Sequence, residues 1–355
     1  MEVFDHDDAG PRVVFGGGAL AEVPAEAARL GAHRVLLIAG RHEKPYADWL
    51  ADTMRPAGRI EDVAMHVPAQ TAAAGVRAAR GAGADLLVCL GGGSATGLAK
   101  AIAKETGLAI LAVPTTYAGS ELTSVWGLTS GGRKRTGRDP RVTPRVVVYD
   151  PELTLTLPAA VSAASGMNAV AHAAEALYAP DATAELKDRA EAGIRALAAA
   201  LPKVVADPGD VAARTDALRG AWWCGAALAG ATMGVHHTIC HVLGGAYTLP
   251  HAETHAAVLP HAVACNEAFA PAAMTRLAAA LNAPDPAPAL WDLTARLGVP
   301  TALAQLGFRH EDVEPAADLV VTQVSVKHGP NPRPVEREWV AELLLAAWDG
   351  ARPAD

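Results

Sequence analysis

The chain has few charged and few aromatic residues for its length. Charged side chains make up 19% of the 355 residues and aromatic ones 5%, whereas hydrophobic residues reach 51%. This composition excludes an intrinsically disordered chain, which requires high charge and little apolar content. A chain of this length also exceeds the size of one typical core, so two domains are expected.

Basic clusters are scarce as well. The formal net charge is −8, and the only run of adjacent basic residues of any length is Arg133-Lys134-Arg135, next to a pair of glycines. An acidic chain without a basic surface stretch is not expected to bind nucleic acid.

The sequence also gives no sign of a disulfide framework, a leader or a membrane span. The four cysteines are far apart in sequence (Cys89, Cys224, Cys240 and Cys265), which excludes a disulfide framework or a zinc knuckle and favours the reducing cytoplasm. The N-terminus, MEVFDHDDAG, is acidic and has no apolar core, so no signal peptide is expected. Residues 221–252 lack charge, but histidines, glycines and Pro250 interrupt them, which predicts a buried helix and no membrane partner.

The end of this uncharged stretch overlaps the region with the most candidate catalytic or metal-binding side chains. Residues 236–261 read HHTICHVLGGAYTLPHAETHAAVLPH and hold six of the 13 histidines. His237 and His241 are four apart, so on a helix they share one face. A single histidine in apolar surroundings is usually a hydrogen-bonded core residue, but six of them indicate a metal site or a proton-handling pocket.

The first part of the chain alternates short apolar runs with alanine-rich helical patterns. Strands are predicted at residues 12–15, 34–38, 85–90 and 109–113 and near Val63, and helices at 19–30 and 69–81 and from Ser94 to Lys104. Such alternation predicts a parallel sheet covered by helices, a Rossmann-like α/β domain over residues 1–157. Val125–Thr129, the Gly131-Gly132 pair and Arg145–Tyr149 suggest a hairpin-like excursion.

From about Pro158 the pattern changes to Ala, Leu, Glu and Arg at helical spacing. No further strand-like run of note occurs, and breaks fall at residues 207–209 and 284–286. An all-helical domain is therefore expected over residues 158–355.

Two loops in the first domain have the residues of a nucleotide site. Gly91-Gly92-Gly93-Ser94 follows a strand and opens a helix, where glycines allow close approach of a pyrophosphate to free N–H groups. The alternative is a plain turn, because this is not the usual dinucleotide fingerprint. The segment after the next strand offers Thr115 and Thr116 at the same sheet edge, where ligands of parallel sheets bind.

The end of the second strand bears on the choice of cofactor. Domains that insist on NADH usually place a carboxylate there, but this strand ends in Ala39-Gly40-Arg41-His42, with no acid before Glu43. Gly40 leaves room and Arg41 is predicted to meet a 2′-phosphate, so NADPH is expected to be accepted as well as NADH. The alternative is that Arg41 points to solvent and Glu43 takes the carboxylate role.

A second group of polar residues opens the helical domain. Asn168 and His172 are four apart, and Glu175 follows three residues later. They form either a polar helix face packed against other helices or, together with the histidines of residues 236–261, a wall of the same pocket.

These segments together resemble the iron-containing alcohol dehydrogenase superfamily and, within it, the maleylacetate reductases. The most specific stretches are residues 114–123 (PTTYAGSELT), 134–139 (KRTGRD), 165–178 (SGMNAVAHAAEALY) and 234–266 (GVHHTICHVLGGAYTLPHAETHAAVLPHAVACN). The resemblance implies a dehydroquinate synthase-like fold, with an α/β nucleotide-binding domain followed by a helical domain, and a homodimer.

The resemblance also implies a site. In the superfamily, the positions that match Asn168, His172, His237 and His251 hold an Asp and three His that ligate one divalent ion, and His241 matches a histidine placed for proton relay. Here Asn168 stands at the Asp position. An amide brings no charge and is a poorer ligand than a carboxylate, so no metal is expected, although three histidines alone can hold zinc.

The implied activity is NAD(P)H-dependent reduction of the carbon–carbon double bond of maleylacetate, a dicarboxylate oxo acid, to give 3-oxoadipate in the aerobic breakdown of aromatic compounds. Two further residues are assigned to the cofactor (Thr123 and Lys134) and three to the substrate (Tyr117, His236 and Arg333). Two alternatives stay open: a metal-dependent alcohol, aldehyde or other oxo-acid reductase of the same superfamily, and a catalytically silent nucleotide-binding protein.

Overall fold

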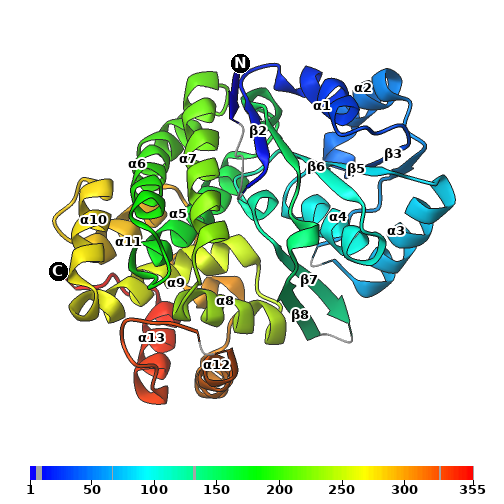
Figure 1. The fold of residues 1–355 in the computed structure, drawn as a ribbon. Helices are drawn as coiled ribbons and strands as arrows, with labels where there is room; N and C mark the ends of the chain where they lie inside the picture. Colours follow the sequence, from blue (N-terminus) through cyan, green and yellow to red (C-terminus); the bar gives the residue numbers. More distant parts are fainter. Residues whose placement is uncertain (5–9, 66, 131–132, 328, 355) are drawn as a thin grey trace. The chain divides into compact units, whose positions relative to one another are not determined.

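The protein is described by a computed structural model that covers residues 1–4, 10–65, 67–130, 133–327 and 329–354, without the side chains of Arg133, Lys134 and Lys327. The chain divides into two compact units, Met1–Leu157 and Pro158–Asp355 (Figure 1).

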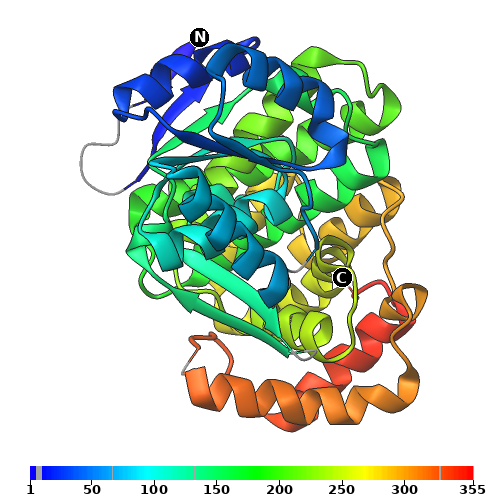
Figure 2. The same cartoon turned by 90° about the vertical axis from the view of Figure 1, so that its right-hand side faces the viewer.

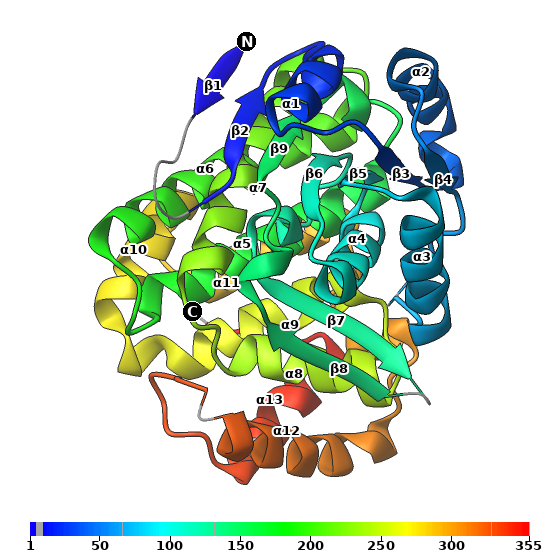
Figure 3. The same ribbon diagram turned by 45° about the vertical axis from the view of Figure 1, so that its right-hand side comes forward.

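Unit 1 is built on one sheet whose strands are parallel except at one edge. In spatial order the strands are β1 (Glu2–Phe4), β2 (Arg12–Phe15), β9 (Val146–Tyr149), β6 (Ala109–Pro114), β5 (Leu86–Gly91), β3 (Val35–Ala39) and β4 (Gly58–Ile60) (Figure 3). Only β1 runs antiparallel to its neighbour. The predicted parallel sheet is confirmed.

Helices cover both faces of this sheet. Alternate residues of β5, such as Leu86 and Val88, pack in one core with Val23 of α1 (Val23–Arg29) and Leu50 of α2 (Lys44–Met54). The opposite face is covered by α3 (Ala69–Ala82) and α4 (Gly93–Thr106). Because side chains on both faces are buried, these strands read as continuous apolar runs and not as alternating ones.

The strand order reverses direction between β3 and β5. From β3 the chain passes through α2 to β4 on one side, and through α3 it returns to β5 on the other side of β3. In doubly wound sheets the ligand binds at this reversal, outside the carboxyl ends of the strands. Gly40 and Gly91 lie at these two ends.

Two details differ from the sequence-based expectation. The excursion exists, but β7 (Val125–Ser130) pairs with β8 (Arg133–Arg138), whereas Val146–Tyr149 lies in the central sheet between β2 and β6. All four residues of β9 are buried, which suits a central strand. The strand expected near Val63 lies slightly earlier, at β4.

Among its described residues unit 2 forms helices and loops and no strand, as expected. Its α-helices are α5 (Ala159–Tyr178), α6 (Ala184–Ala206), α7 (Val211–Gly230), α8 (Val235–Ala246), α9 (His251–Asn266), α10 (Pro271–Leu281), α11 (Pro286–Arg296), α12 (Val313–Lys327) and α13 (Arg337–Asp349). Helix α5 is buried from Ser162 to Leu177 and forms the centre of the unit.

Small residues allow the helices around α5 to pack closely. A Cβ on Gly193 of α6 would lie 2.7 Å from the Cys224 sulfur of α7, and one on Gly166 of α5 would lie 2.5 Å from the Leu201 side chain. A second core joins α8 and α9 to α12 and α13, which lie side by side in Figure 2.

Across the described part of the chain, none of the helices combines the length and the apolar character that crossing a bilayer requires.

Candidate active site

Two loops of unit 1 that the sequence assigns to a cofactor lie against each other. Gly91 has a φ of +144°, a conformation that a side chain rarely allows. A Cβ on Gly92 would lie 2.8 Å from the Thr116 side chain, and the Thr115 N–H donates to the Gly91 carbonyl at 3.2 Å. Glycine is therefore required here for the two loops to approach.

The glycine loop opens helix α4 and leaves its first N–H groups available. Gly92 is the N-cap residue, and among the described residues no side chain caps the helix there. The first N–H groups of a helix have no intrahelical acceptor and favour an anion. Gly93 is exposed and Ser94 half-buried, so these positions fit a pyrophosphate.

Glu43, shortly after β3, places its carboxylate at the sheet edge, which the sequence analysis gave only as the alternative. The Glu43 Oε1 accepts a hydrogen bond from the Thr115 hydroxyl at 3.2 Å, and its Oε2 lies 3.0 Å from where a Cβ on Gly40 would stand. The room expected at Gly40 is thus filled by Glu43, which reaches the ends of β3, β5 and β6. Arg41 is exposed beside it.

Two more residues assigned to the cofactor or the substrate, Thr123 and Tyr117, are buried inside unit 1. The Thr123 hydroxyl donates to the Ser120 carbonyl at 3.1 Å and accepts from Lys100 Nζ at 2.9 Å. Tyr117 has no solvent exposure. The Lys134 backbone lies in β8, and its side chain is outside the described residues.

In unit 2, three helices bring six histidines into one cluster. His172 comes from α5, His236, His237 and His241 from α8, and His251 and His255 from α9. The ring of His255 is central, since its centroid lies 4.5 to 6.5 Å from those of the other five. His241 and His251 are half-buried and face each other with rings 6.4 Å apart, whereas the other four are buried.

A buried carboxylate anchors this cluster. Glu175 has no solvent exposure and accepts the N–H groups of Gly234 at 3.0 Å and His236 at 2.9 Å, at the N-terminus of α8. Its Oε2 lies 2.5 Å from His237 Nδ1. Burial acts to raise the pKa of Glu175, but the charge and hydrogen bond of His237 lower it, and the net shift is downward. Glu175 is therefore a carboxylate inside the unit.

Glu175, His237, His172 and Asn168 form a chain of hydrogen bonds in which every donor points toward Glu175. His237 Nε2 lies 2.7 Å from His172 Nδ1, and His172 Nε2 lies 3.3 Å from Asn168 Nδ2. Because Glu175 accepts and the Asn168 amide donates, each neutral imidazole carries its proton on Nδ1.

Burial keeps two other rings of the cluster neutral. It lowers the pKa of His236 to about 4 and that of His255 well below its ordinary value, with nearby histidines adding to the effect on His255. His236 Nε2 donates to the His255 carbonyl at 3.1 Å. Both ring nitrogens of His255 lack a hydrogen-bond partner among the described residues.

The resemblance implies a set of residues as metal ligands, but in this structure their side chains are not arranged to bind one ion. His172 and His237 direct ring nitrogens at each other and at Asn168 and Glu175, and Asn168 contributes a neutral amide. A different group, His236, His237 and His255, does present one nitrogen each within 4.8 Å of one another. Zinc bound tetrahedrally at about 2.1 Å needs nitrogens about 3.4 Å apart, so these rings would have to approach.

The segment of one predicted residue, Arg333, reaches the anchor of the cluster. The Arg333 backbone N–H donates to Asn266 Oδ1 at the last residue of α9, and its guanidinium lies 4.9 Å from the Trp339 ring. Pro330 and Asn331, just before it, lie within 3.3 Å of where a Cβ on Gly234 would stand, and the Gly234 N–H donates to Glu175.

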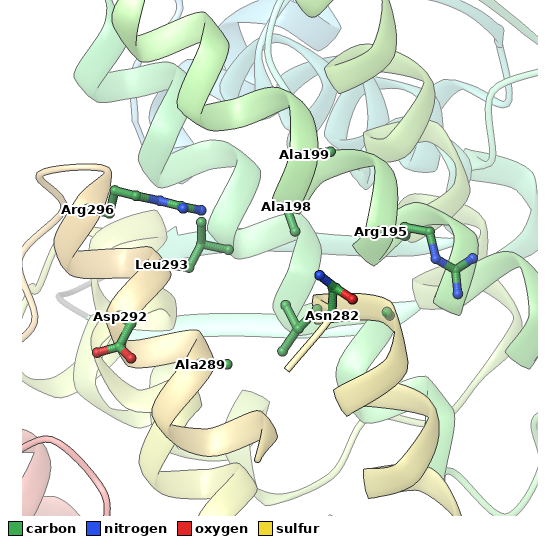
Figure 4. A pocket seen from close by; sticks show the side chains of 10 residues that line it. Arg195, Ala198, Ala199, Asn282, Ala289, Asp292, Leu293 and Arg296 are labelled. Carbon is green, nitrogen blue, oxygen red and sulfur yellow. The ribbon is translucent and has the colours of Figure 1, made fainter. Parts of the chain in front are cut away.

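A hollow of about 430 Å³ also lies elsewhere in unit 2 (Figure 4). Its walls come from α6, α10 and α11 and include Arg195, Asn282, Asp292 and Arg296. None of the cluster histidines lines it, so it has no part in the site described above.

Sequence reasoning noticed Glu175 and His255 without assigning them a role. Each had a signal: Glu175 lies seven residues after Asn168 and His255 four after His251, spacings that repeat one helix face. Lys100 has no such signal, because a lysine in an alanine-rich helix usually faces solvent.

Comparisons with known proteins identify the family of this chain. Residues 10–151 match the model of the iron-containing alcohol dehydrogenases, and residues 162–348 match that of the C-terminal region of the Fe-containing alcohol dehydrogenase family. The chain is 49% identical to a maleylacetate reductase of Burkholderia cepacia over 100% of both chains. It is 46% identical to the solved maleylacetate reductase of Agrobacterium tumefaciens, with a TM-score of 0.91 and coverage of 99% of this chain and 100% of that one. A solved putative alcohol dehydrogenase of Ralstonia eutropha is 50% identical, with a TM-score of 0.94 and full coverage of both chains.

Proposed function

Since this chain belongs to the iron-containing alcohol dehydrogenase family of oxidoreductases, we propose that it reduces the carbon–carbon double bond of maleylacetate with NADH or NADPH, giving 3-oxoadipate in the aerobic breakdown of aromatic compounds. The observation that carries this proposal is the cluster of six imidazoles anchored by Glu175, in a chain 45–49% identical over its length to several maleylacetate reductases.

The cofactor part of the proposal rests on unit 1. The Gly91–Ser94 loop and the start of α4 hold the pyrophosphate, and Thr115 and Thr116 line the same edge. Glu43 and Arg41 lie at the strand reversal, where the adenosine ribose binds in such sheets. When bound, the nicotinamide supplies the hydride.

The chemistry of the substrate explains the imidazoles. Maleylacetate is an enone, so addition of hydride at the alkene carbon β to the ketone pushes an electron pair onto the ketone oxygen and forms an enolate. His241 and His251, the half-buried members of the cluster, donate hydrogen bonds to this oxygen. One of them then gives a proton to the α-carbon, and the ketone re-forms.

The buried members of the cluster serve the proton supply. His255 lies between His251 and His237, with ring centroids 4.5 and 4.8 Å away. The Glu175 carboxylate accepts a hydrogen bond from His237 Nδ1 and places a negative charge beside the buried rings. This charge favours the passage of a proton through the cluster.

We further propose that the reaction needs no resident metal. The support is the neutral amide of Asn168 and the direct hydrogen bond between His172 and His237, which uses nitrogens that a metal would require. Imidazole donors then replace a metal ion as the partner of the enolate oxygen.

A cytoplasmic location and a homodimer belong to the same proposal. The free thiols of Cys89, Cys224, Cys240 and Cys265 support a reducing compartment. The homodimer rests on the resemblance alone.

The test is oxidation of NADH by freshly generated maleylacetate, with and without EDTA, together with metal analysis of the purified protein. We expect turnover that EDTA leaves unchanged and no stoichiometric iron or zinc. Activity that requires one bound ion, through the His236, His237 and His255 group, would replace the metal-free mechanism. Absence of NADH and NADPH oxidation with maleylacetate and other oxo acids would favour a silent nucleotide-binding protein.

A further inference from the structure

A lysine without solvent exposure lies in unit 1 beneath the segment that follows β6. Lys100 of α4 is 1% exposed, and its Nζ lies 2.6 Å from the Ser120 carbonyl, 2.7 and 2.9 Å from the Thr123 carbonyl and hydroxyl, and 2.9 Å from the Val125 carbonyl. Burying an ammonium group is costly unless its N–H groups are all bonded. The three N–H groups here have four oxygens to choose from.

The charge of Lys100 is balanced inside the unit. Glu121 is 3% exposed, attracts Lys100 electrostatically and accepts a hydrogen bond from the Tyr149 hydroxyl at 2.8 Å. Burial lowers the pKa of Lys100 to about 7 and raises the pKa of Glu121, whereas the attraction between the two groups and the four oxygens around Nζ favour the ammonium form. The proposed reaction uses neither of them.

The position of Lys100 joins the two segments of the proposed cofactor site. Helix α4 starts at the glycine loop, and Lys100 lies two turns into it. The oxygens that surround Nζ belong to residues 120–125, which continue from the Thr115–Ala118 loop that packs on Gly92 and Gly93. One ammonium group thus fixes residues 120–125 relative to the helix that starts at the pyrophosphate loop.

We propose that Lys100 is a positioning residue for the nicotinamide nucleotide: an internal cation, enclosed by oxygens of Ser120, Thr123 and Val125, that holds the threonine loop in its cofactor-binding conformation. This inference rests on the proposed function. It predicts that loss of the ammonium weakens binding of the cofactor and leaves that of the substrate unchanged.

The experiment compares Lys100→Met, which keeps the aliphatic stem, with Lys104→Met on the same helix as the matched control, because Lys104 is partly exposed. The readouts are the Kd of NADH by fluorescence titration, the KM of each substrate, kcat and Tm. In Lys100→Met we expect the Kd and KM of NADH to rise at least about tenfold, with the KM of maleylacetate within about twofold of wild type. Lys104→Met should match wild type.

Rescue by a small cation separates positioning from general stability. Lys100→Ala leaves space for an ion, so ammonium chloride should restore much of the NADH affinity, whereas tetramethylammonium chloride, which has no N–H groups, should not. The rescue experiment also tests the inference if Lys100→Met does not fold. In that case ammonium should restore both folding and NADH binding to Lys100→Ala.

The outcomes that overturn the inference are distinct from failure of the proposed function. A lowered Tm with wild-type NADH affinity in the folded fraction of Lys100→Met would show a purely structural lysine. So would a loss of NADH affinity that tetramethylammonium and ammonium restore equally. Wild-type protein that binds neither NADH nor NADPH would instead remove the proposed function itself.

Discussion

At the scale of single residues, the histidine cluster divides into rings that are accessible and rings that are buried. His241 and His251 are half-buried and near each other, whereas His236 and His255 are buried and kept neutral. In the proposed reaction we therefore assign contact with the enolate oxygen to the first pair.

Replacement of His241 or His251 by Ala is expected to lower kcat by roughly 10²–10³-fold, since one preorganised donor to the oxyanion is lost. The KM of maleylacetate should change much less, because the interaction strengthens only as charge develops. Steady-state kinetics check this, with His310→Ala as the control at an exposed position in the same unit. Wild-type turnover in both variants would return these histidines to a packing role.

Asn168 is the residue on which the proposal of a metal-free site depends. We expect Asn168→Asp to bind close to one Zn²⁺ or Fe²⁺ per chain, because a carboxylate adds charge and frees His172 Nε2 from its amide donor. Metal content by mass spectrometry and the shift of Tm with added zinc measure this gain.

Asn168→Ala is the matched control for this change, because it removes the amide donor without supplying a charged ligand. It should bind no more metal than wild type. If Asn168→Asp takes up no more zinc than Asn168→Ala, the amide is not what keeps a metal from binding.

At the scale of secondary-structure elements, the ends of β3, β5 and β6 place opposite charges where a ribose is expected. Arg41 attracts a 2′-phosphate and Glu43 repels it, so we expect wild-type kcat/KM for NADPH and NADH to agree within about tenfold, or roughly 1.4 kcal/mol.

The two charges should act in opposite directions on cofactor choice. Glu43→Gln is expected to shift the ratio about tenfold towards NADPH, and Arg41→Ala about tenfold towards NADH. Lys44→Gln, at the exposed neighbour, should leave the ratio near that of wild type. The hypothesis fails if wild type prefers NADH several hundredfold, or if both variants keep the wild-type ratio.

The elements also show how far sequence reasoning reaches. Apolar runs such as Leu86–Leu90 and the glycines at 91–93 predicted strands and helices that the structure confirms, because these signals are local; the nucleotide role of the loop stays a prediction. The partner of Val146–Tyr149 was not predictable from the pattern, since any fully buried strand reads alike. The direction of the Asn168–Glu175 hydrogen-bond chain and the burial of Lys100 depend on side chains brought together by tertiary packing.

At the scale of the whole molecule, buried histidines make stability sensitive to acid. Burial lowers the pKa of His261, on α9, to about 4 from an ordinary value of 6.5. The unfolded chain therefore binds more protons between these values, and stability falls as the pH drops through this window. Between pH 7 and pH 5 the cost is about 2 kcal/mol for one such group.

Between pH 7 and pH 5 the Tm of His261→Leu is expected to fall less than that of wild type, by roughly 3 °C. Thermal melts at several pH values measure this difference, and His310→Leu, at an exposed position, should melt as wild type does. An unchanged dependence of Tm on pH in His261→Leu would mean that His261 is protonated in the folded protein.

The pairing of β2 with β9 also sets the order in which the chain can fold during its synthesis. Arg12–Phe15 is placed against Val146–Tyr149, more than 130 residues later. The ribosome therefore releases β3 to β6, which pair with one another, well before the sheet can receive its N-terminal strands. Until residue 149 emerges, the apolar β2 can pair only with the short strand β1 and lacks its parallel neighbour β9, so it is exposed to chaperones and to aggregation. A nascent chain stopped before β9 should be captured by a chaperone, and one long enough to expose all of unit 1 should not.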